Sequence, residues 1–472
     1  MKLKLLTLLL IAGTALGQTK TQVADNLQKR QAEYGDLALQ IWNYAEVGYK
    51  EYKSSELLQN KLKSEGFNVV AGVAGIPTAF TATFGSGSPV IGILGEFDAL
   101  PGLSQAAKPD KESLNGVAGH ACGHHLFGVG SAAAAIAVKD WMKKTGQKGT
   151  IRFYGTPAEE GGSGKVYMVR EGLFKDVDVV LHWHPGSQNS ANASSSLANK
   201  SGKFRFYGRS AHAAASPESG RSALDGVEAM TDMINMMREH VQEDSRIHYV
   251  ITNGGKAPNV VPDFAELYLY VRHPNRTNVK EMWTWIENIA QGAALGTGTR
   301  AESEILGGVY DLLPNETLST IIHQNMSTVG GYILTPEEKI FAEKIQTTEG
   351  VKKTPLEYTS TVQPLSFEKS ANGGSTDVGD VSWTVPTAGL STATWVPGTP
   401  AHSWQAVAAG GTQIGVKGMM TAAKTLTLSA IDLFEKPELI KKAKEEFNSK
   451  TEGGFKYESL LGTRKPALDY RN

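Results

Sequence analysis

The chain has 472 residues, of which 47 are basic and 48 are acidic, and its formal net charge is −1. This balance gives no electrostatic case for a nucleic-acid partner, and the length allows two domains that each bury a core. Cys122 is the only cysteine. An internal disulfide is therefore excluded, and the thiol is expected to be either buried and inert or bound to a metal ion.

The first residues, MKLKLLTLLLIAGTALGQ, have the composition of a secretory signal peptide. Two lysines precede a short leucine-rich run, and the small residues Ala15 and Gly17 precede a cleavage point. The pattern predicts a signal peptide over residues 1–17 and export to the periplasm or the extracellular space. That run is too short to cross a bilayer and no later one is long enough, so no membrane anchor is expected.

Helical periodicity covers residues 20–65, and short apolar strands then alternate with helices. "PVIGILGEFDAL" is a predicted strand that ends at Asp98, and "GTIRFYGTPAEE" and "DVDVVLHWHPG" are two more, with the alanine-rich helix "SAAAAIAVKDWM" among them. This order predicts an α/β fold in which helices cover a mostly parallel sheet. We assign residues 18–198 and 313–472 to this catalytic domain.

The pattern changes over residues 199–312. "KFRFYGRSAHAAA" and "AELYLYVRHP" alternate between apolar and polar residues, and helices are predicted around 219–242 and 277–296. These features predict an inserted α+β domain. The stretch from 333 to 372 is polar and irregular and receives no assignment, and the charged tail after Pro437 is expected to be peripheral.

Side chains suited to metal binding and acid–base chemistry follow the predicted strands. Because sites in open parallel sheets form at the carboxyl ends of strands, these side chains are expected to meet at one edge. They are Asp98, Cys122, His124, His125, Glu159, Glu160, His182 and His184.

The spacing of these residues indicates a catalytic metal site. Cys122 and His124 are two residues apart in a glycine-flanked turn at a helix start, so both can reach one metal centre. Carboxylate partners favour a catalytic over a structural site. Glu159 and Glu160 are adjacent and point differently, so one can bind metal while the other acts as a general base. The motifs H-E-x-x-H and G-x-S-x-G do not occur, which argues against zincin proteases and serine hydrolases.

Over almost its whole length the chain resembles the di-metal aminoacylase and carboxypeptidase family of amidohydrolases. Long segments carry this resemblance: "IWNYAEVGYKEYKSSELL", "VIGILGEFDALPGLSQ", "GHACGHHLFG", "RFYGTPAEEGGSGK", "LHWHPG", "AHAAASPESGRSALDGV", "PNVVPDFAE", "STDVGDVSW" and "VPGTPAHSWQ".

The resemblance implies two divalent metal ions per subunit, zinc or manganese. It assigns Glu159 as the catalytic base and Asp98 as a carboxylate that orients the site. His182 is an alternative to His184 as a ligand, because both lie on one face of a strand. His125 stands where relatives usually have aspartate or asparagine, and it either supports a ligand or competes for metal. The implied metal ligands are Cys122, His124, Glu160, His184 and His402.

The resemblance also assigns roles outside the metal ligands. His212 of the inserted domain is implied to complete the site of a neighbouring subunit in a homodimer, and a hetero-oligomer with a related subunit is the alternative. Asn259 and Arg272 lie where lid residues contact substrate, and Asp377 is a loop carboxylate near the site.

The expected function is metal-dependent hydrolysis of the amide bond in an N-acyl or N-aroyl amino acid, with p-aminobenzoyl-glutamate as the specific candidate. A dipeptidase or carboxypeptidase with the same site is the alternative within enzymes. A metal-containing binding protein without catalysis is the alternative from another class, and the presence of both Glu159 and His212 argues against it.

Overall fold

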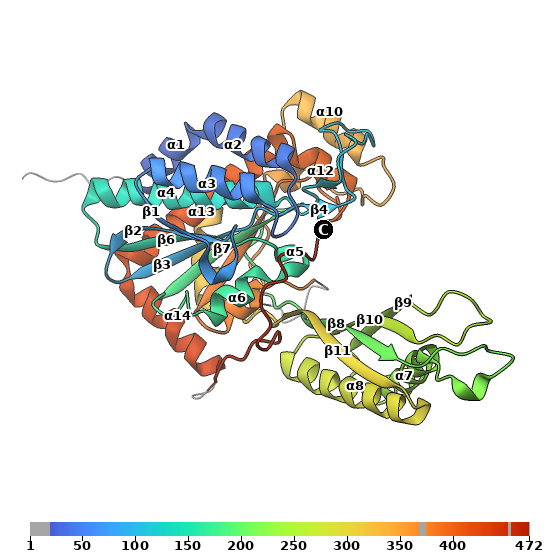
Figure 1. Ribbon diagram of the computed structural model, residues 1–472. Coiled ribbons are helices and arrows are strands. Elements are labelled where there is room, and N and C mark those ends of the chain that lie inside the picture. The colour runs from blue at the N-terminus through green and yellow to red at the C-terminus, as the bar shows by residue number, and fades with distance from the viewer. Residues whose placement is uncertain (1–18, 368–373, 452–454, 472) are drawn as a thin grey trace, which may run out of the picture.

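The computed structural model describes residues 19–367, 374–451 and 455–471. The predicted signal peptide lies outside these residues. Two units are visible in Figure 1: a larger unit built on a central sheet, and an inserted unit that carries its own sheet and two helices.

The central sheet has six strands in the order β1-β2-β6-β3-β7-β12, in which β6, β3, β7 and β12 are parallel and the β1–β2 and β2–β6 pairs are antiparallel. Every residue of β3 is buried, as expected for a strand that helices cover on both faces. The strands are β1 (Asn68–Ala71), β2 (Phe80–Ser86), β3 (Val90–Gly95), β6 (Gly149–Gly155), β7 (Val179–Gly186) and β12 (Thr387–Ala393).

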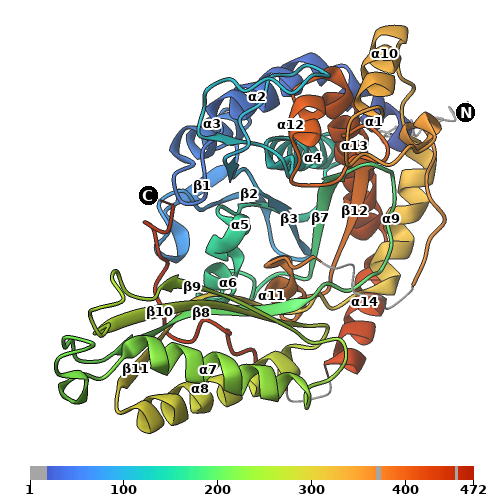
Figure 2. The same cartoon turned by 90° about the vertical axis from the view of Figure 1, so that its right-hand side faces the viewer.

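Helices pack on both sides of this sheet (Figure 2). The long helices α4 and α13 contact each other and the strands, and the small side chains of the alanine-rich α4 allow this close packing. The predicted α/β fold with a mostly parallel sheet is therefore confirmed. The helices are α1 (Lys20–Gln28), α2 (Gln31–Tyr44), α3 (Tyr52–Ser64), α4 (His124–Thr145), α6 (Gly164–Arg170), α9 (Glu316–Val329), α11 (Val378–Ser382), α12 (Trp404–Gly410), α13 (Gln413–Glu435) and α14 (Pro437–Lys450).

The inserted unit runs from Ala198 to Val309. Its antiparallel strands have the order β11-β8-β10-β9, and α7 (Ala223–Arg238) and α8 (Arg276–Thr297) cover one face, while the other face is turned towards the larger unit (Figure 2). Alternate residues of β10 are buried under the helices, which explains the period-two pattern of its sequence. The strands are β8 (Ala198–Tyr207), β9 (Arg246–Asn253), β10 (Phe264–His273) and β11 (Arg300–Val309).

In the described part of the unassigned stretch, residues 333–367, there is one regular helix, α10 (Pro336–Ile345), which begins with a capping box at Thr335. Among the described residues no helix combines the length and apolar character that crossing a membrane requires. The shorter elements are β4 (Leu100–Pro101), β5 (Ala118–Gly119), α5 (Glu159–Gly162), η1 (Val73–Gly75), η2 (Pro217–Ser219) and η3 (Leu356–Thr359).

Candidate metal centre and active site

The structure places the predicted site residues of the larger unit around the carboxyl ends of its parallel strands. Asp98 follows β3, Glu159 and Glu160 follow β6, and His184 lies in the last part of β7. Cys122 lies two residues before the start of α4. Segments far apart in the chain therefore present their side chains at one edge of the sheet.

The turn before α4 brings a thiol and an imidazole to the same place. Gly123 has a φ of 76°, and a Cβ added there would lie 2.6 Å from the Cβ of Pro185, so the turn requires glycine. On either side of it, Cys122 is buried and His124 is fully buried. The Cys122 Sγ lies 3.4 Å from Nε2 of His184.

Asp98 fixes both His124 and the backbone after β6. Its Oδ1 lies 2.8 Å from Nδ1 of His124, and its Oδ2 accepts a 2.9 Å hydrogen bond from the backbone N–H of Glu160. Burial alone would raise the pKa of Asp98, but the neighbouring His124 holds it below its ordinary value. An ionised Asp98 leaves Nε2 as the imidazole nitrogen that can bind a metal ion.

Two sets of potential metal ligands share one thiol. The ligand atoms of Cys122, His124 and His184 lie within 4.8 Å of one another, and so do those of Cys122, Glu160 and His402. Nε2 of His124 and Oε1 of Glu160 are buried and have no hydrogen-bond partner among the described residues. Since orphaned buried polar atoms are costly, and since thiolate, imidazole and carboxylate all bind divalent ions, the residues fit a pair of metal ions.

The loop that carries Glu159 and Glu160 has an unusual backbone. Ala158 and Ser163 on its two sides both adopt left-handed conformations, with φ of 57° and 59°. Such conformations persist where surrounding contacts hold them, and here the Ala158 N–H donates a 2.8 Å hydrogen bond to the buried Glu51. Burial, followed by the charge of nearby carboxylates, raises the pKa of Glu159 well above its ordinary value.

Tyr470 and Arg471, near the end of the chain, bond to the loop that carries Glu159 and Glu160. The prediction that the tail after Pro437 is peripheral is therefore wrong. The carbonyl oxygen of Glu160 accepts hydrogen bonds from the Tyr470 hydroxyl at 3.1 Å and from Nη2 of Arg471 at 2.8 Å. The ring of Tyr470 also packs edge-on against Tyr49, with ring centroids 5.5 Å apart. The charge pattern of the tail does not indicate any of these contacts.

The structure separates the histidines that the sequence left ambiguous. Whereas His184 contacts the thiol, His182 packs against Gly389 of β12, and burial lowers its pKa to about 4. Nε2 of His125 lies 3.0 Å from the carbonyl oxygen of Gly410. His125 therefore bonds to the backbone and does not point towards the ligand sets.

Among the described residues, the candidate ligand sets contain no residue of the inserted unit. His212 is exposed and belongs to the loop between β8 and α7. Figure 1 shows that loop at the end of the inserted unit away from α5. Its Nδ1 accepts hydrogen bonds from the backbone N–H groups of two following alanines, which leaves Nε2 available. Asn259 is also exposed, and Arg272 lies half-buried with its guanidinium 5.4 Å from the ring of Tyr270.

Glu96 and Lys165 are two buried charged residues near the site that the sequence patterns did not predict. Glu96 is 1% exposed and directly follows β3, and the fully buried Lys165 bonds to it and to Asp377. Glu96 could have been predicted from its position two residues before Asp98. Alternate residues of an extended segment point to the same side, so the two carboxylates should lie together.

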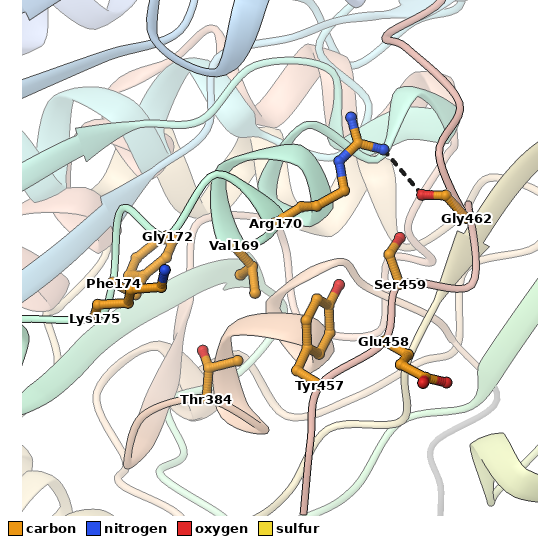
Figure 3. A pocket seen from close by; sticks show the side chains of 10 residues that line it. All are labelled: Val169, Arg170, Gly172, Phe174, Lys175, Thr384, Tyr457, Glu458, Ser459 and Gly462. Carbon is orange, nitrogen blue, oxygen red and sulfur yellow. Dashed lines mark hydrogen bonds between the residues drawn. The ribbon is translucent and has the colours of Figure 1, made fainter.

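Figure 3 shows the side chains that line a cavity of about 590 Å³. Arg170, Tyr457 and Ser459 are among the residues that line it, and Arg170 donates a hydrogen bond to the carbonyl of Gly462. None of the predicted site residues is among those lining it. A second cavity, of about 530 Å³, adjoins Gly161 and lies between the loop after Glu160 and the sheet of the inserted unit.

Replacing His184 by alanine is expected to deplete bound metal more than replacing His182 by alanine, because only His184 contacts Cys122. Metal content after dialysis, measured by inductively coupled plasma mass spectrometry, checks this order. Both changes remove a partly buried imidazole from β7, so each variant controls for the fold of the other. Greater metal loss from the His182 variant would exchange the two roles.

A chain that ends after Asp469 is expected to bind metal more weakly and to turn over more slowly, by roughly 10-fold each, as when supporting contacts of a ligand are removed. The truncation removes both hydrogen-bond donors to the Glu160 carbonyl. Tyr470→Phe keeps the ring contact with Tyr49 and should lose less. Wild-type metal affinity and kcat in the truncated chain would show that the loop holds its shape without this segment.

Comparisons with known proteins agree with this arrangement. Residues 92–403 match the model of peptidase family M20/M25/M40. The chain is 42% identical over 457 residues to a subunit of the p-aminobenzoyl-glutamate hydrolase of Escherichia coli, covering 91% of this chain and 95% of the relative. It is 29% identical over 461 residues to the Xaa-Arg dipeptidase of Mus musculus, covering 94% of each.

A solved structure supports the fold. The aminobenzoyl-glutamate utilization protein of Klebsiella pneumoniae superposes with a TM-score of 0.63 over 88% of this chain and 99% of that chain, at 16% sequence identity. The match to the family model and the extended identity to the Escherichia coli hydrolase confirm the resemblance that the sequence motifs indicated. The chain belongs to peptidase family M20/M25/M40 and is a hydrolase that cleaves amide bonds.

Proposed function

We propose that the protein is an exported two-metal amidohydrolase that cleaves N-acyl or N-aroyl amino acids, with p-aminobenzoyl-glutamate as its specific substrate. One observation carries the proposal: two ligand sets share Cys122, and Glu159 lies beside them with its ligand atom within 4.8 Å of that of His124. The 42% identity to a p-aminobenzoyl-glutamate hydrolase supports the choice of substrate.

The proposed metal ligands are the five side chains of the two sets. One thiolate and three imidazoles favour zinc, whereas the carboxylate also suits manganese. When bound, the two ions would polarise the scissile carbonyl and lower the pKa of the attacking water. The ligands are Cys122, His124, Glu160, His184 and His402.

In the proposed reaction Glu159 acts as both base and acid. It accepts a proton from the attacking water and then delivers that proton to the nitrogen of the leaving amino acid. Asp98 keeps the His124 ring and the Glu160 backbone in place through its two oxygens. We assign stabilisation of the oxyanion to His212 of a second subunit, because this exposed side chain belongs to none of the ligand sets among the described residues of its own chain.

The cavity of about 530 Å³ beside the loop offers side chains that suit the proposed substrate. Tyr268 and Tyr270 provide aromatic rings for an aroyl group, and Arg464 and Arg471 provide guanidinium groups for a carboxylate. Asn259 and Arg272 remain proposed substrate contacts by resemblance. A homodimer is the proposed assembly, and a hetero-oligomer with a related subunit is the alternative, since the Escherichia coli relative is named as one subunit of a hydrolase.

Metal analysis followed by a hydrolysis panel tests the proposal. The protein reconstituted with Zn²⁺ or Mn²⁺ is assayed on p-aminobenzoyl-glutamate, N-benzoyl-glycine, N-acetyl-glutamate and dipeptides that end in arginine. We expect two ions per chain and the highest kcat/KM on p-aminobenzoyl-glutamate. Hydrolysis of the arginine dipeptides alone would favour a dipeptidase, as in the mouse relative. Cell fractionation with an antibody checks export.

A further inference from the structure

The inserted unit is covalently joined to the larger unit at one end. β8 begins and β11 ends at that end, where Asn199 pairs with Val309. Among the described residues, the helices and strands of the inserted unit make their extensive contacts only with one another. Units joined in this way move relative to each other unless a large apolar interface holds them. The orientation seen in Figure 2 therefore depends on what else connects the two units.

Two neighbouring leucines near the end of the chain are buried in different cores. Leu460 packs in the apolar cluster of the inserted unit, whereas Leu461 packs in that of the larger unit. A Cβ added to Gly308 of β11 would lie 2.8 Å from the Cβ of Leu460, so this side chain lies directly against the strand. The backbone between the two leucines therefore passes from one unit to the other.

Arg464 makes the same connection with its backbone and its side chain. Its carbonyl oxygen accepts a 2.6 Å hydrogen bond from Nη1 of Arg170 on α6, in the larger unit. Its own Nη1 donates at 2.5 Å to the carbonyl oxygen of Leu306 on β11, in the inserted unit. Its Nη2 lies 3.7 Å from Oε1 of Glu304 on the same strand. One residue thus bonds to both units.

We propose that residues 458–464 form a strap that fastens the inserted unit to the larger unit and sets its orientation. Released from β11, the strap would leave the inserted unit free to turn about its two linkers, as hinged domains do. Arg464 also lines the cavity of about 530 Å³ between the inserted sheet and the loop after Glu160. Turning of the inserted unit would therefore change the width of this cavity. The device acts within one chain and does not depend on the proposed reaction.

Glu304 offers a way to separate a connection between units from one within a unit. Its carboxylate accepts a 2.7 Å hydrogen bond from Arg205 of β8, inside the inserted unit, and it also lies near Arg464 of the strap. Both arginines line the same cavity. Loss of either one removes a guanidinium from the same carboxylate, but only loss of Arg464 breaks a connection between the units.

The test measures the orientation of the inserted unit by double electron–electron resonance. Spin labels are attached to keto amino acids that replace Leu295 on α8 and Ile340 on α10, which are 86% and 68% exposed. This chemistry leaves the thiol of Cys122 unlabelled. The labelled protein is refolded with an excess of unlabelled protein and loaded with Zn²⁺, so that distances within one chain dominate. We expect one distance population in the otherwise wild-type chain.

Arg464→Ala is expected to add a second distance population. Loss of a charge-assisted hydrogen bond should raise the ratio of released to fastened molecules by roughly 10–100-fold. Arg205→Ala is the matched control and should keep the wild-type distribution. Wild-type distances in Arg464→Ala would overturn the proposal, and so would an equal change in both variants, which would assign the effect to the inserted sheet itself.

Tyr310→Phe is the second variant, in case Arg464→Ala does not fold. The hydroxyl of Tyr310, directly after β11, donates a 2.6 Å hydrogen bond to the carbonyl oxygen of Glu458 in the strap. Phenylalanine keeps the ring and loses only this bond, so the same second population should appear with a smaller share. A distribution identical to that of the wild type would show that the strap does not set the orientation.

Discussion

Glu159→Gln is expected to lower kcat by about 10²–10⁴-fold, the range typical of a lost general base, while both metal ions stay bound. Glutamine has the size of glutamate but cannot accept a proton from water at neutral pH. Glu159 begins the short turn α5, and the neighbouring Glu160, not Glu159, belongs to a ligand set with Cys122. Single-turnover assays and metal analysis of the same preparation measure the two properties together.

Glu51→Gln is the matched control for this change. Glu51 is a buried carboxyl that accepts from the Ala158 N–H on the same loop, and burial and then Asp98 raise its pKa to about 8. At neutral pH glutamine resembles this protonated side chain, so kcat should stay within a few fold of the wild type. If Glu159→Gln also keeps its rate within a few fold, the base is another group.

His212→Ala is expected to keep its metal ions and to lose roughly 10²–10³-fold in kcat, as when one oxyanion donor is removed. The reason is that His212 is exposed and belongs to no ligand set among the described residues of its own chain, so its proposed target is the partner's site. Loss of activity in this single variant is expected both for a role between subunits and for a role within one chain. A pair of inactive variants reveals which of the two holds.

The two inactive variants, His212→Ala and Glu159→Ala, are unfolded and refolded together in equal amounts. With random pairing about half of the dimers are mixed, and one of the two sites in each mixed dimer has both residues intact, so about a quarter of wild-type activity should return. Each variant refolded alone is the control. If size analysis confirms mixed dimers and the mixture stays inactive, His212 does not act across the subunit interface.

The fold could be predicted because its signals are local. Continuous apolar runs such as that of β3 identify buried parallel strands, and period-two alternation identifies strands such as β10. The placement of Asp98, Glu159 and His184 near strand ends follows from the same patterns, since parallel strands share a carboxyl edge. The two-residue spacing of Cys122 and His124 in a glycine-flanked turn at a helix start was enough to place both in the candidate site.

Contacts between distant segments could not be predicted in this way. Lys165 and Asp377 are 212 positions apart, and nothing in the periodicity of either segment indicates that they pair. The choice between His182 and His184 also needed the structure, because both lie on one face of β7 and only packing against β12 and Cys122 distinguishes them. Which buried charges pair depends on how the chain connects its strands and helices. The residue pattern of a single segment carries no information about these connections.

The hydrogen bonds from Tyr470 and Arg471 to Glu160 can form only late in translation. The ribosome makes Glu160 310 residues before Tyr470. At about 5–20 residues per second this interval lasts roughly 15–60 s. During that time the nascent chain can complete the central sheet. The loop with Glu159 and Glu160 still lacks the hydrogen bonds from Tyr470 and Arg471. The loop therefore gains these two hydrogen bonds only after this late segment has been made and has docked.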